Sequence, residues 1–171
     1  MPKNRRRPDY PFKKPKKKPK KHAHKKPVLC PYCGAQALLK DGSFLFGENP
    51  FVKNVFICVR YPDCDSYVQA HESNLEPMGT LANATLRKKR MVTHMYFDKL
   101  WNAPKGKSSV FTRNQAYKWL CDKVGGQVHH SRNHIAGMDE FLCDRVIKEV
   151  KRILWIQKQK EGTEGRGEDS G

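Results

Sequence analysis

Two pairs of cysteines carry the clearest chemistry in this sequence. Cys30 and Cys33 are separated by two residues and are followed directly by Gly34, in the run Cys-Pro-Tyr-Cys-Gly. Cys58 and Cys64 form a second pair whose longer spacer contains the turn-forming run Tyr-Pro-Asp. Four thiolates from two turns make the closed tetrahedral ligand set of structural zinc, whereas a catalytic zinc keeps one position open. We therefore predict one structural Zn2+ bound by these four cysteines.

The residue after the first pair also fits a metal-binding turn. Gly34 suits a positive φ, which closes the turn and lets backbone N–H groups point at the thiolates. Three histidines are alternative ligands: His71 follows the last expected strand, and His22 and His24 precede the first pair. A histidine beside a complete set of four cysteines is more often incidental, so the cysteines remain the predicted ligands.

Short strands are expected to carry these turns. The segments 37–39, 44–46, 55–57 and 67–68 are apolar or β-branched and are separated by Gly, Asn, Pro and Asp. Strands this small have no sizeable core, so the metal must supply folding energy. The pattern predicts a zinc ribbon of short antiparallel strands within residues 28–76.

After residue 77 the apolar spacing becomes helical. It predicts helices at residues 83–101, 112–124 and 139–158. Asn83 can cap the first helix, and Thr112 with Gln115 forms a capping box for the second. The fold class is therefore α+β, with the ribbon followed by a three-helix segment at 77–158. Cys121 and Cys143 fall beside apolar helical positions and are interpreted as buried structural thiols.

The positive charge is concentrated in one segment. Residues 1–27 hold 13 Lys and Arg against one Asp, so +12 of the chain's net +17 lies there. With six prolines and few aliphatic residues, this segment is predicted to be a disordered basic tail, and the polar stretch 159–171 a second disordered tail. We see no apolar stretch of signal-peptide or membrane-span type. The expected location is the bacterial cytoplasm, at the nucleoid if the protein binds DNA.

Five motifs resemble a known family. The runs CPYCGAQALLKDGS, DCDSYVQAH, GTLANATLRKKR, AYKWL and HIAGM, in that order, are similar to a phage and prophage zinc-finger-containing domain family of undefined function. This resemblance covers roughly residues 28–150 and implies a phage or prophage origin. The cysteine pattern with its Tyr-Pro run also resembles the C-terminal zinc ribbons of bacterial type I topoisomerases, which implies binding to DNA, often single-stranded.

Clustered cations indicate the partner. They are Arg5, Arg6, Arg7, Lys16, Lys17 and Lys18 in the tail, and Arg87, Lys88, Lys89 and Arg90 at the start of the first helix. Such cations attract phosphate without reading sequence, and aromatic residues of the ribbon could stack unpaired bases. We therefore expect a nucleic-acid-binding protein, for DNA rather than RNA, that acts in phage DNA metabolism or transcription control.

Two other functions stay open. One is an adaptor that binds a host protein through the ribbon and helices. The other is a metal-dependent nuclease using His130 or His134, because some nucleases combine His, Asn and His with cysteine pairs. Here the histidines are crowded within a few residues, and the sequence has no paired carboxylates or phosphate-binding Gly-rich loop. The residue pattern therefore favours a binding protein over an enzyme.

Overall fold

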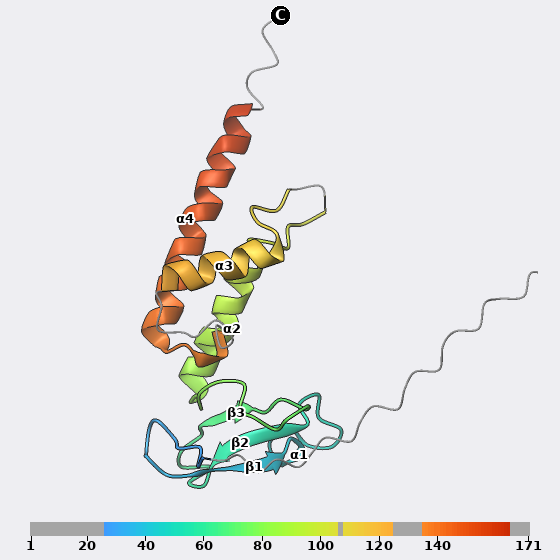
Figure 1. The fold of residues 1–171 in the computed structure, drawn as a ribbon, viewed down its shortest axis with the longest axis vertical. Coiled ribbons are helices and arrows are strands. Elements are labelled where there is room, and N and C mark those ends of the chain that lie inside the picture. The colour runs from blue at the N-terminus through green and yellow to red at the C-terminus, as the bar shows by residue number, and fades with distance from the viewer. Residues whose placement is uncertain (1–25, 106–107, 125–134, 165–171) are drawn as a thin grey trace, which may run out of the picture.

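A three-stranded sheet followed by helices forms the fold (Figure 1). The computed structural model describes residues 26–105, 108–124 and 135–164. Strands β1 (Ala37–Asp41), β2 (Asn54–Cys58) and β3 (Tyr67–Gln69) are antiparallel, in the order β1-β2-β3. The predicted α+β class, a small ribbon followed by helices, is confirmed. The basic tail up to residue 25 lies outside the described residues.

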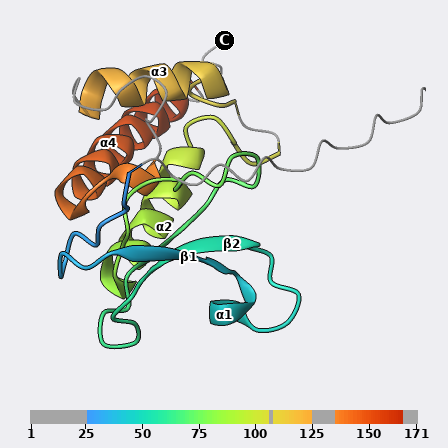
Figure 2. The same cartoon turned by 60° about the horizontal axis from the view of Figure 1, so that its bottom comes forward.

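One expected strand is a helical turn instead. Residues 44–46 belong to α1 (Ser43–Phe46), which lies beside the sheet (Figure 2). The backbone N–H of Ser43 donates to Asp41 Oδ1 over 2.8 Å, and the N–H groups of Leu45 and Phe46 donate to Gly42 O. The apolar run Phe-Leu-Phe suggested a strand, but the preceding Asp-Gly-Ser turn bends the chain into a helix.

The middle strand is buried on both faces. Val55 and Ile57 point to one face, with 0% and 3% of their surface exposed, and Phe56 and Cys58 point to the other, with 5% and 1% exposed. Leu38 lies opposite Ile57 in β1, so it shares the first face. Because β2 is covered on both sides, elements outside the sheet must pack on each face.

Three helices follow, with the caps that the sequence predicts. In α2 (Ala84–Asp98), Asn83 Oδ1 accepts from the N–H of Leu86 over 2.9 Å. Ahead of α3 (Arg113–Val124), Thr112 and Gln115 exchange hydrogen bonds of 2.8 and 3.3 Å as a capping box. A short 3-10 turn, η1 (Ile135–Gly137), precedes α4 (Glu140–Glu164). The predicted helices are all present.

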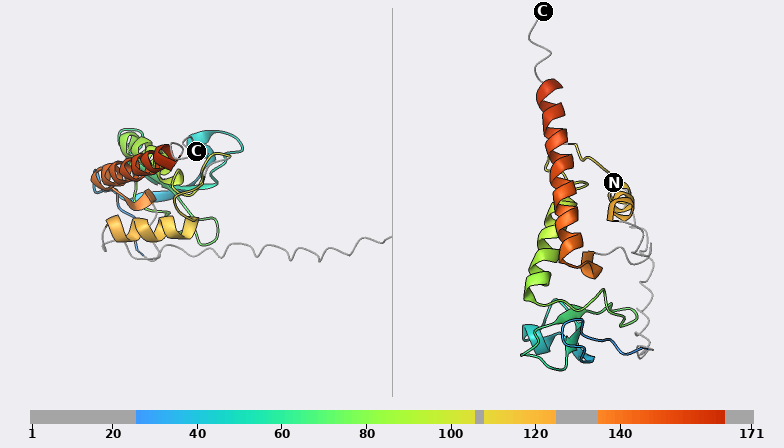
Figure 3. Two further views of the ribbon diagram at one scale, coloured as in Figure 1. Left: turned by 90° about the horizontal axis from the view of Figure 1, so that it is seen from above. Right: turned by 90° about the vertical axis from the view of Figure 1, so that its left-hand side faces the viewer.

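The last helix is longer than predicted. α4 continues to Glu164, so residues 159–164 are helical where a disordered tail was expected. The helix passes through Gly162. Figure 3 shows α4 extending well beyond α2 and α3. Much of its surface therefore has no helix packed against it.

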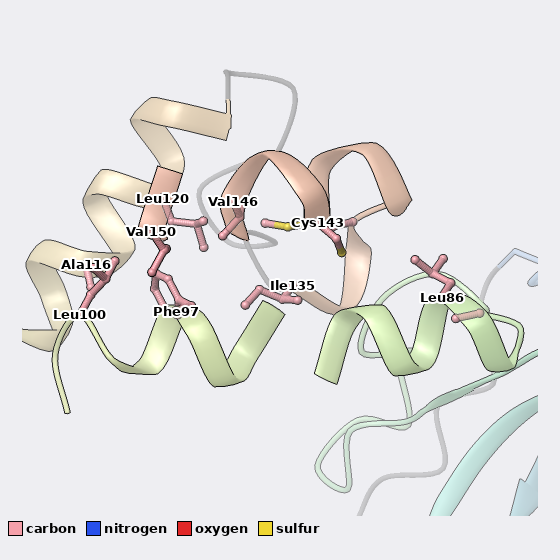
Figure 4. Packing of buried hydrophobic residues seen from close by; sticks show 11 residues of the cluster. Leu86, Phe97, Leu100, Ala116, Leu120, Ile135, Cys143, Val146 and Val150 are labelled. Carbon is pink, nitrogen blue, oxygen red and sulfur yellow. The ribbon is translucent and has the colours of Figure 1, made fainter. Parts of the chain in front are cut away.

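The helices share one apolar core (Figure 4). Phe97, Leu100 and Val150 have none of their surface exposed, and the ring of Phe97 meets that of Tyr117 edge-on at 5.1 Å. Cys143 is fully buried in this core, as predicted for a structural thiol, and Cys121 is half-buried. α2 and α4 thus form the scaffold of the helical unit.

The segment between ribbon and helices belongs to both. Pro77 bridges Ala70, and Ala82 bridges Tyr67 in an exchange of backbone hydrogen bonds of 3.1 and 3.2 Å. Gly79 passes so close to η1 that a Cβ there would lie 2.1 Å from the carbonyl oxygen of Ala136. Residues 77–82, which the sequence pattern grouped with the helices, thus extend the ribbon's pairing and fix η1 against it.

Candidate metal centre

The first cysteine pair lies in a tight turn before β1. The Gly34 N–H donates to Cys30 O over 2.9 Å, and Gly34 has φ +68°, the positive value predicted for it. The Cys30 N–H donates to Ala35 O over 2.8 Å, which closes the turn from the other side. An L side chain at Gly34 would be strained, because that φ disfavours residues with a Cβ.

The second pair is held by the end of β2 and the loop that follows. Cys58 ends the strand, and its N–H donates to Ser66 O over 3.0 Å. The Tyr61 N–H donates to Cys58 O, and the Cys64 N–H donates to Arg60 O, each over 3.0 Å. These two turns fold the five-residue spacer back, as the Tyr-Pro-Asp run predicted.

The four sulfurs converge on one point. All lie within 4.8 Å of one another, with Cys30 Sγ 3.5 Å from Cys64 Sγ and Cys33 Sγ 3.4 Å from Cys58 Sγ. A tetrahedral ZnS4 centre with Zn–S bonds of ~2.3 Å needs sulfurs roughly 3.8 Å apart, so the set fits zinc closely. All four cysteines are free thiols. They bind one structural Zn2+, and no ligand position is left for a substrate.

The local electrostatics favour thiolate at one cysteine and the neutral thiol at another. Burial alone would raise the pKa of Cys30, but hydrogen bonds from the backbone of Tyr32 and Cys33, together with those of the Cys64 and Ser66 side chains, outweigh it, and the pKa falls to about 7. Burial raises the pKa of the Cys58 thiol to about 12 in the metal-free site. One sulfur is thus readily ionised at neutral pH, while Cys58 needs the cation to hold its charge.

Ser66 is a further member of the centre that the sequence pattern did not reveal. Its side chain is completely buried, and its Oγ lies 3.4 Å from Cys64 Sγ. A hydroxyl at this distance can donate to the metal-bound thiolate and orient it. Serine after the second pair is too common a residue type to signal this role.

The alternative ligands do not join the set. Among the described residues, the cluster of candidate metal ligands contains cysteines alone, without His71. His22, His24, His130 and His134 lie outside the described residues, so the nuclease interpretation has no described geometry.

Among the described residues, none of the helices has both the length and the apolar character that a membrane span requires.

The basic residues at the start of α2 serve the fold. Arg90 is 7% exposed, and its guanidinium donates to Met138 O, Thr80 O and Thr80 Oγ1 over 2.7–2.8 Å. The expected phosphate contact at Arg90 is therefore corrected: its donors are used inside the molecule. In sequence the acceptors lie 10 and 48 residues away, so local pattern could not reveal them.

Two other members of this group also have internal partners. Arg87 donates to Asp65 Oδ2 over 3.0 Å and lies 3.9 Å from the ring centre of Tyr67. Lys89 pairs with Asp144 at 2.7 Å and Glu140 at 3.7 Å, whereas Lys88 is exposed. The basic residues at the start of α2 therefore mainly connect this helix to the ribbon and to α4. The tail cations Arg5, Arg6, Arg7, Lys16, Lys17 and Lys18 lie outside the described residues.

The fold and site define a zinc-ribbon protein with a helical extension. Residues 26–153 match the model of a family described as a zinc-finger-containing domain, and the chain belongs to that family. The match includes the ribbon, α2, α3 and the first half of α4, so the family's domain covers both the ribbon and the helices. No curated protein and no solved structure matches the chain.

Proposed function

We propose that this zinc-finger protein binds nucleic acid, with DNA as its partner, and that it is of phage or prophage origin and acts in phage DNA metabolism or transcription control. The observation that carries the proposal is a group of aromatic rings on the ribbon, three of them solvent-exposed and the fourth, Tyr67, half-buried. We call Phe44, Phe46, Tyr61 and Tyr67 the aromatic surface.

These rings gather over one face of the sheet. Phe44 meets Tyr61 at a centroid distance of 6.0 Å, and Phe46 meets Tyr67 at 5.9 Å, both edge-on. Phe44, Phe46 and Tyr61 are 56%, 45% and 40% exposed. Lys40 Nζ lies 5.8 Å from the Phe44 ring centre and adds a positive charge beside it.

Part of each ring has a structural use. Tyr67 and Lys40 share the sheet face of Val55 and Ile57, so the contacts made by Phe44 and Phe46 place α1 over these two buried residues. The remaining surface of the rings faces solvent. Exposed aromatic faces beside cations suit stacking of unpaired bases, a mode that tolerates any sequence.

The charge distribution supports the same partner. The segment 1–27 carries +12 of the chain's +17. In residues 40–63, the stretch of sequence that holds Phe44, Phe46 and Tyr61, three cations are balanced by three carboxylates, so long-range attraction must come from elsewhere in the chain. A basic segment would supply a salt-sensitive attraction, and the rings would supply short-range contact with bases.

Binding of labelled single-stranded DNA, duplex DNA and RNA by the full-length protein, across a salt series, tests the proposal. Replacing Phe44 and Tyr61 by Leu keeps apolar cover over the sheet but removes the aromatic faces. We expect a loss of affinity for single strands of about tenfold or more. Phe141→Leu, a change at a 71% exposed ring in α4, is the matched control. If the wild-type protein bound none of the three probes at low salt, the proposal would be refuted.

A second candidate function, an adaptor for a host protein, has one observation in its favour. Met91 and Met95 are 57% and 61% exposed and lie one turn apart on α2. Exposed methionines are frequent on adaptable protein-binding surfaces. Replacing the tail cations by Gln separates the candidates, because an adaptor would keep its protein partner while a nucleic-acid binder would lose most of its affinity.

A further inference from the structure

The outer face of α4 is a continuous strip of cations around one exposed tryptophan. Its members recur at three- and four-residue intervals, which places them on one side of a helix. They are Arg145, Lys148, Lys151, Arg152, Trp155 and Lys158, and we call them the α4 basic face. All are exposed, and Trp155 is 63% exposed.

The opposite side of the helix explains this arrangement. Cys143, Val146 and Val150 are 0–1% exposed and form the stripe that packs in the helical core. The α4 basic face therefore lies away from this apolar core, and Lys151 at its edge also contacts the ring of Tyr96 in α2. The helix also extends past α2 and α3 (Figures 1 and 3), which leaves room for a large partner beside it.

Acidic residues on α4 do little to neutralise this strip. Asp144 pairs with Lys89 at 2.7 Å, and Glu149 pairs with Arg152 at 3.3 Å. Arg145, Lys148 and Lys158 have no carboxylate partner within ion-pair distance in the described part of the chain. A row of like charges on one face favours an anionic partner that can contact several of them at once.

A neighbouring helix adds to the positive charge. Lys99, directly after α2, and Lys151 of α4 both place their Nζ near the ring centre of Tyr96, at 4.9 and 5.0 Å. Two ammonium groups are thus held at one ring, although like charges repel. An anion bound beside them would relieve that repulsion.

We infer that the α4 basic face binds the phosphate backbone of the nucleic acid, with Trp155 against its sugars or bases. From Arg145 to Lys158 the strip is about 20 Å long at 1.5 Å per residue, or about six base pairs of duplex at 3.4 Å each. A row of cations with an aromatic ring beside it suits a polyanion whose bases can stack on that ring. This inference rests on the proposed function and adds a second contact surface, remote from the ribbon.

A charge-neutralising triple variant of the full chain tests it: Lys148→Gln, Arg152→Gln and Lys158→Gln. Each phosphate contact contributes about 0.9 to the salt slope on duplex DNA, so we expect the slope to fall by about 2–3 and affinity by about tenfold or more. The matched control replaces three exposed lysines outside this face, Lys105, Lys118 and Lys123, by Gln. It removes the same net charge, and we expect a much smaller change in slope. Zinc content and thermal unfolding of both variants should equal those of the wild type.

A second readout tests contact directly. Quenching of tryptophan fluorescence on DNA binding should largely disappear in Trp155→Phe, while Trp101 and Trp119 remain to report the fold. An unchanged affinity and slope in the α4 triple, or equal losses in both triples, would overturn the inference while wild-type binding upholds the proposed function. Binding of the α4 face to vesicles of anionic phospholipid in place of DNA would also overturn it. If the wild type binds no nucleic acid, the proposed function itself fails.

Discussion

The ribbon and the helical unit are stabilised in different ways. The buried cluster of the ribbon is small, and two of its members, Cys30 and Cys58, are zinc ligands. The cluster consists of Cys30, Ala37, Phe56, Cys58, Val68, Ala70 and Leu81. The helical cluster is larger and contains no predicted metal ligand among its described members. Ordering a residue costs roughly 1–2 kcal/mol, which the ribbon's few apolar side chains cannot offset alone. Zinc must therefore hold the ribbon, while apolar packing holds the helices.

This difference also bears on surface chemistry. Because zinc anchors the end of the sheet where Ala37 pairs with Cys58, the ribbon can leave Phe44, Phe46 and Tyr61 largely exposed. In the helical unit the ring of Phe97 is completely buried, and those of Tyr117 and Trp119 are half-buried against the core. The metal-held ribbon thus leaves most of these rings available to a partner. The helical unit uses the rings of its core internally and exposes others, such as Trp155, only on the outside of α4.

The largest contrast should appear on loss of the metal. Cys58→Ser removes a buried ligand, and structural zinc contributes apparent folding free energies of about 10–16 kcal/mol. We expect zinc content to fall from one ion to nearly none and the amides of β1–β3 to lose protection from hydrogen exchange. The amides of α2 and α4 should keep most of theirs.

The matched control is Cys121→Ser, which changes a half-buried thiol of the helical unit. It should retain a full complement of zinc. Equal loss of protection in α4 and β2 after removal of the metal would contradict the contrast, because it would mean that the helices also depend on zinc.

Truncation in the helical core should show the reverse pattern. Phe97→Ala empties a completely buried site and should lower the free energy of unfolding by about 3–5 kcal/mol. Zinc should stay bound at one ion per chain, as measured by metal analysis. Met95→Ala on the same helix removes a 61% exposed side chain and should change stability by less than about 0.5 kcal/mol. Zinc release by Phe97→Ala alone would show that the ribbon needs the helical core.

Arg90 offers a smaller effect that separates structural from functional charge. Arg90→Met leaves the carbonyls of Thr80 and Met138 without their donor and should cost about 1–3 kcal/mol in denaturant unfolding. Lys88→Met removes the same charge from an exposed neighbour and should leave stability nearly unchanged. If both variants were equally stable, the buried guanidinium would not serve the role assigned to it.

The zinc ligands were predictable because their information is local. Pairs such as Cys30 and Cys33 determine a turn within a few residues, and Gly34 takes the φ that its type suggests. The caps at Asn83 and Thr112 are equally local and are confirmed. Such features depend on neighbours in the chain, so a single sequence suffices to find them.

Other features depend on distant partners or on competing local signals. The role of Arg90 is set by Thr80 and Met138, and that of Ser66 by the folded sulfur cluster, so neither could be predicted from spacing. The apolar run 44–46 was wrongly predicted as a strand, because the turn at Asp41 outweighs a strand-like pattern three residues long. The α4 basic face follows helical spacing, but its exposure is fixed only once the core side of the helix is known.

The smallest predicted effect concerns the junction between the two regions. Arg87 in α2 bonds Asp65 and covers Tyr67 of β3, and the Asp65 carboxylate also accepts from the N–H of Ala84 at the start of α2. The two side chains are 26% and 41% exposed, so solvent screens the ion pair. Asp65→Asn should therefore cost only about 1 kcal/mol, including a weakened helix start.

A double-mutant cycle of Asp65→Asn with Arg87→Gln isolates the pair itself. We expect a coupling free energy below about 1 kcal/mol, compared with about 0.3–0.5 kcal/mol for the exposed pair of Arg152 and Glu149 within α4. The junction pair joins ribbon to helix. Without it, zinc removal should still expose the amides of β3 to exchange but should lower the protection of the α2 amides less than it does in the wild type. Hydrogen exchange of α2 in the metal-free Asp65→Asn variant measures this. If zinc removal lowers the protection of α2 equally in the variant and the wild type, the coupling between the regions runs through the backbone bridge of Tyr67 and Ala82 instead.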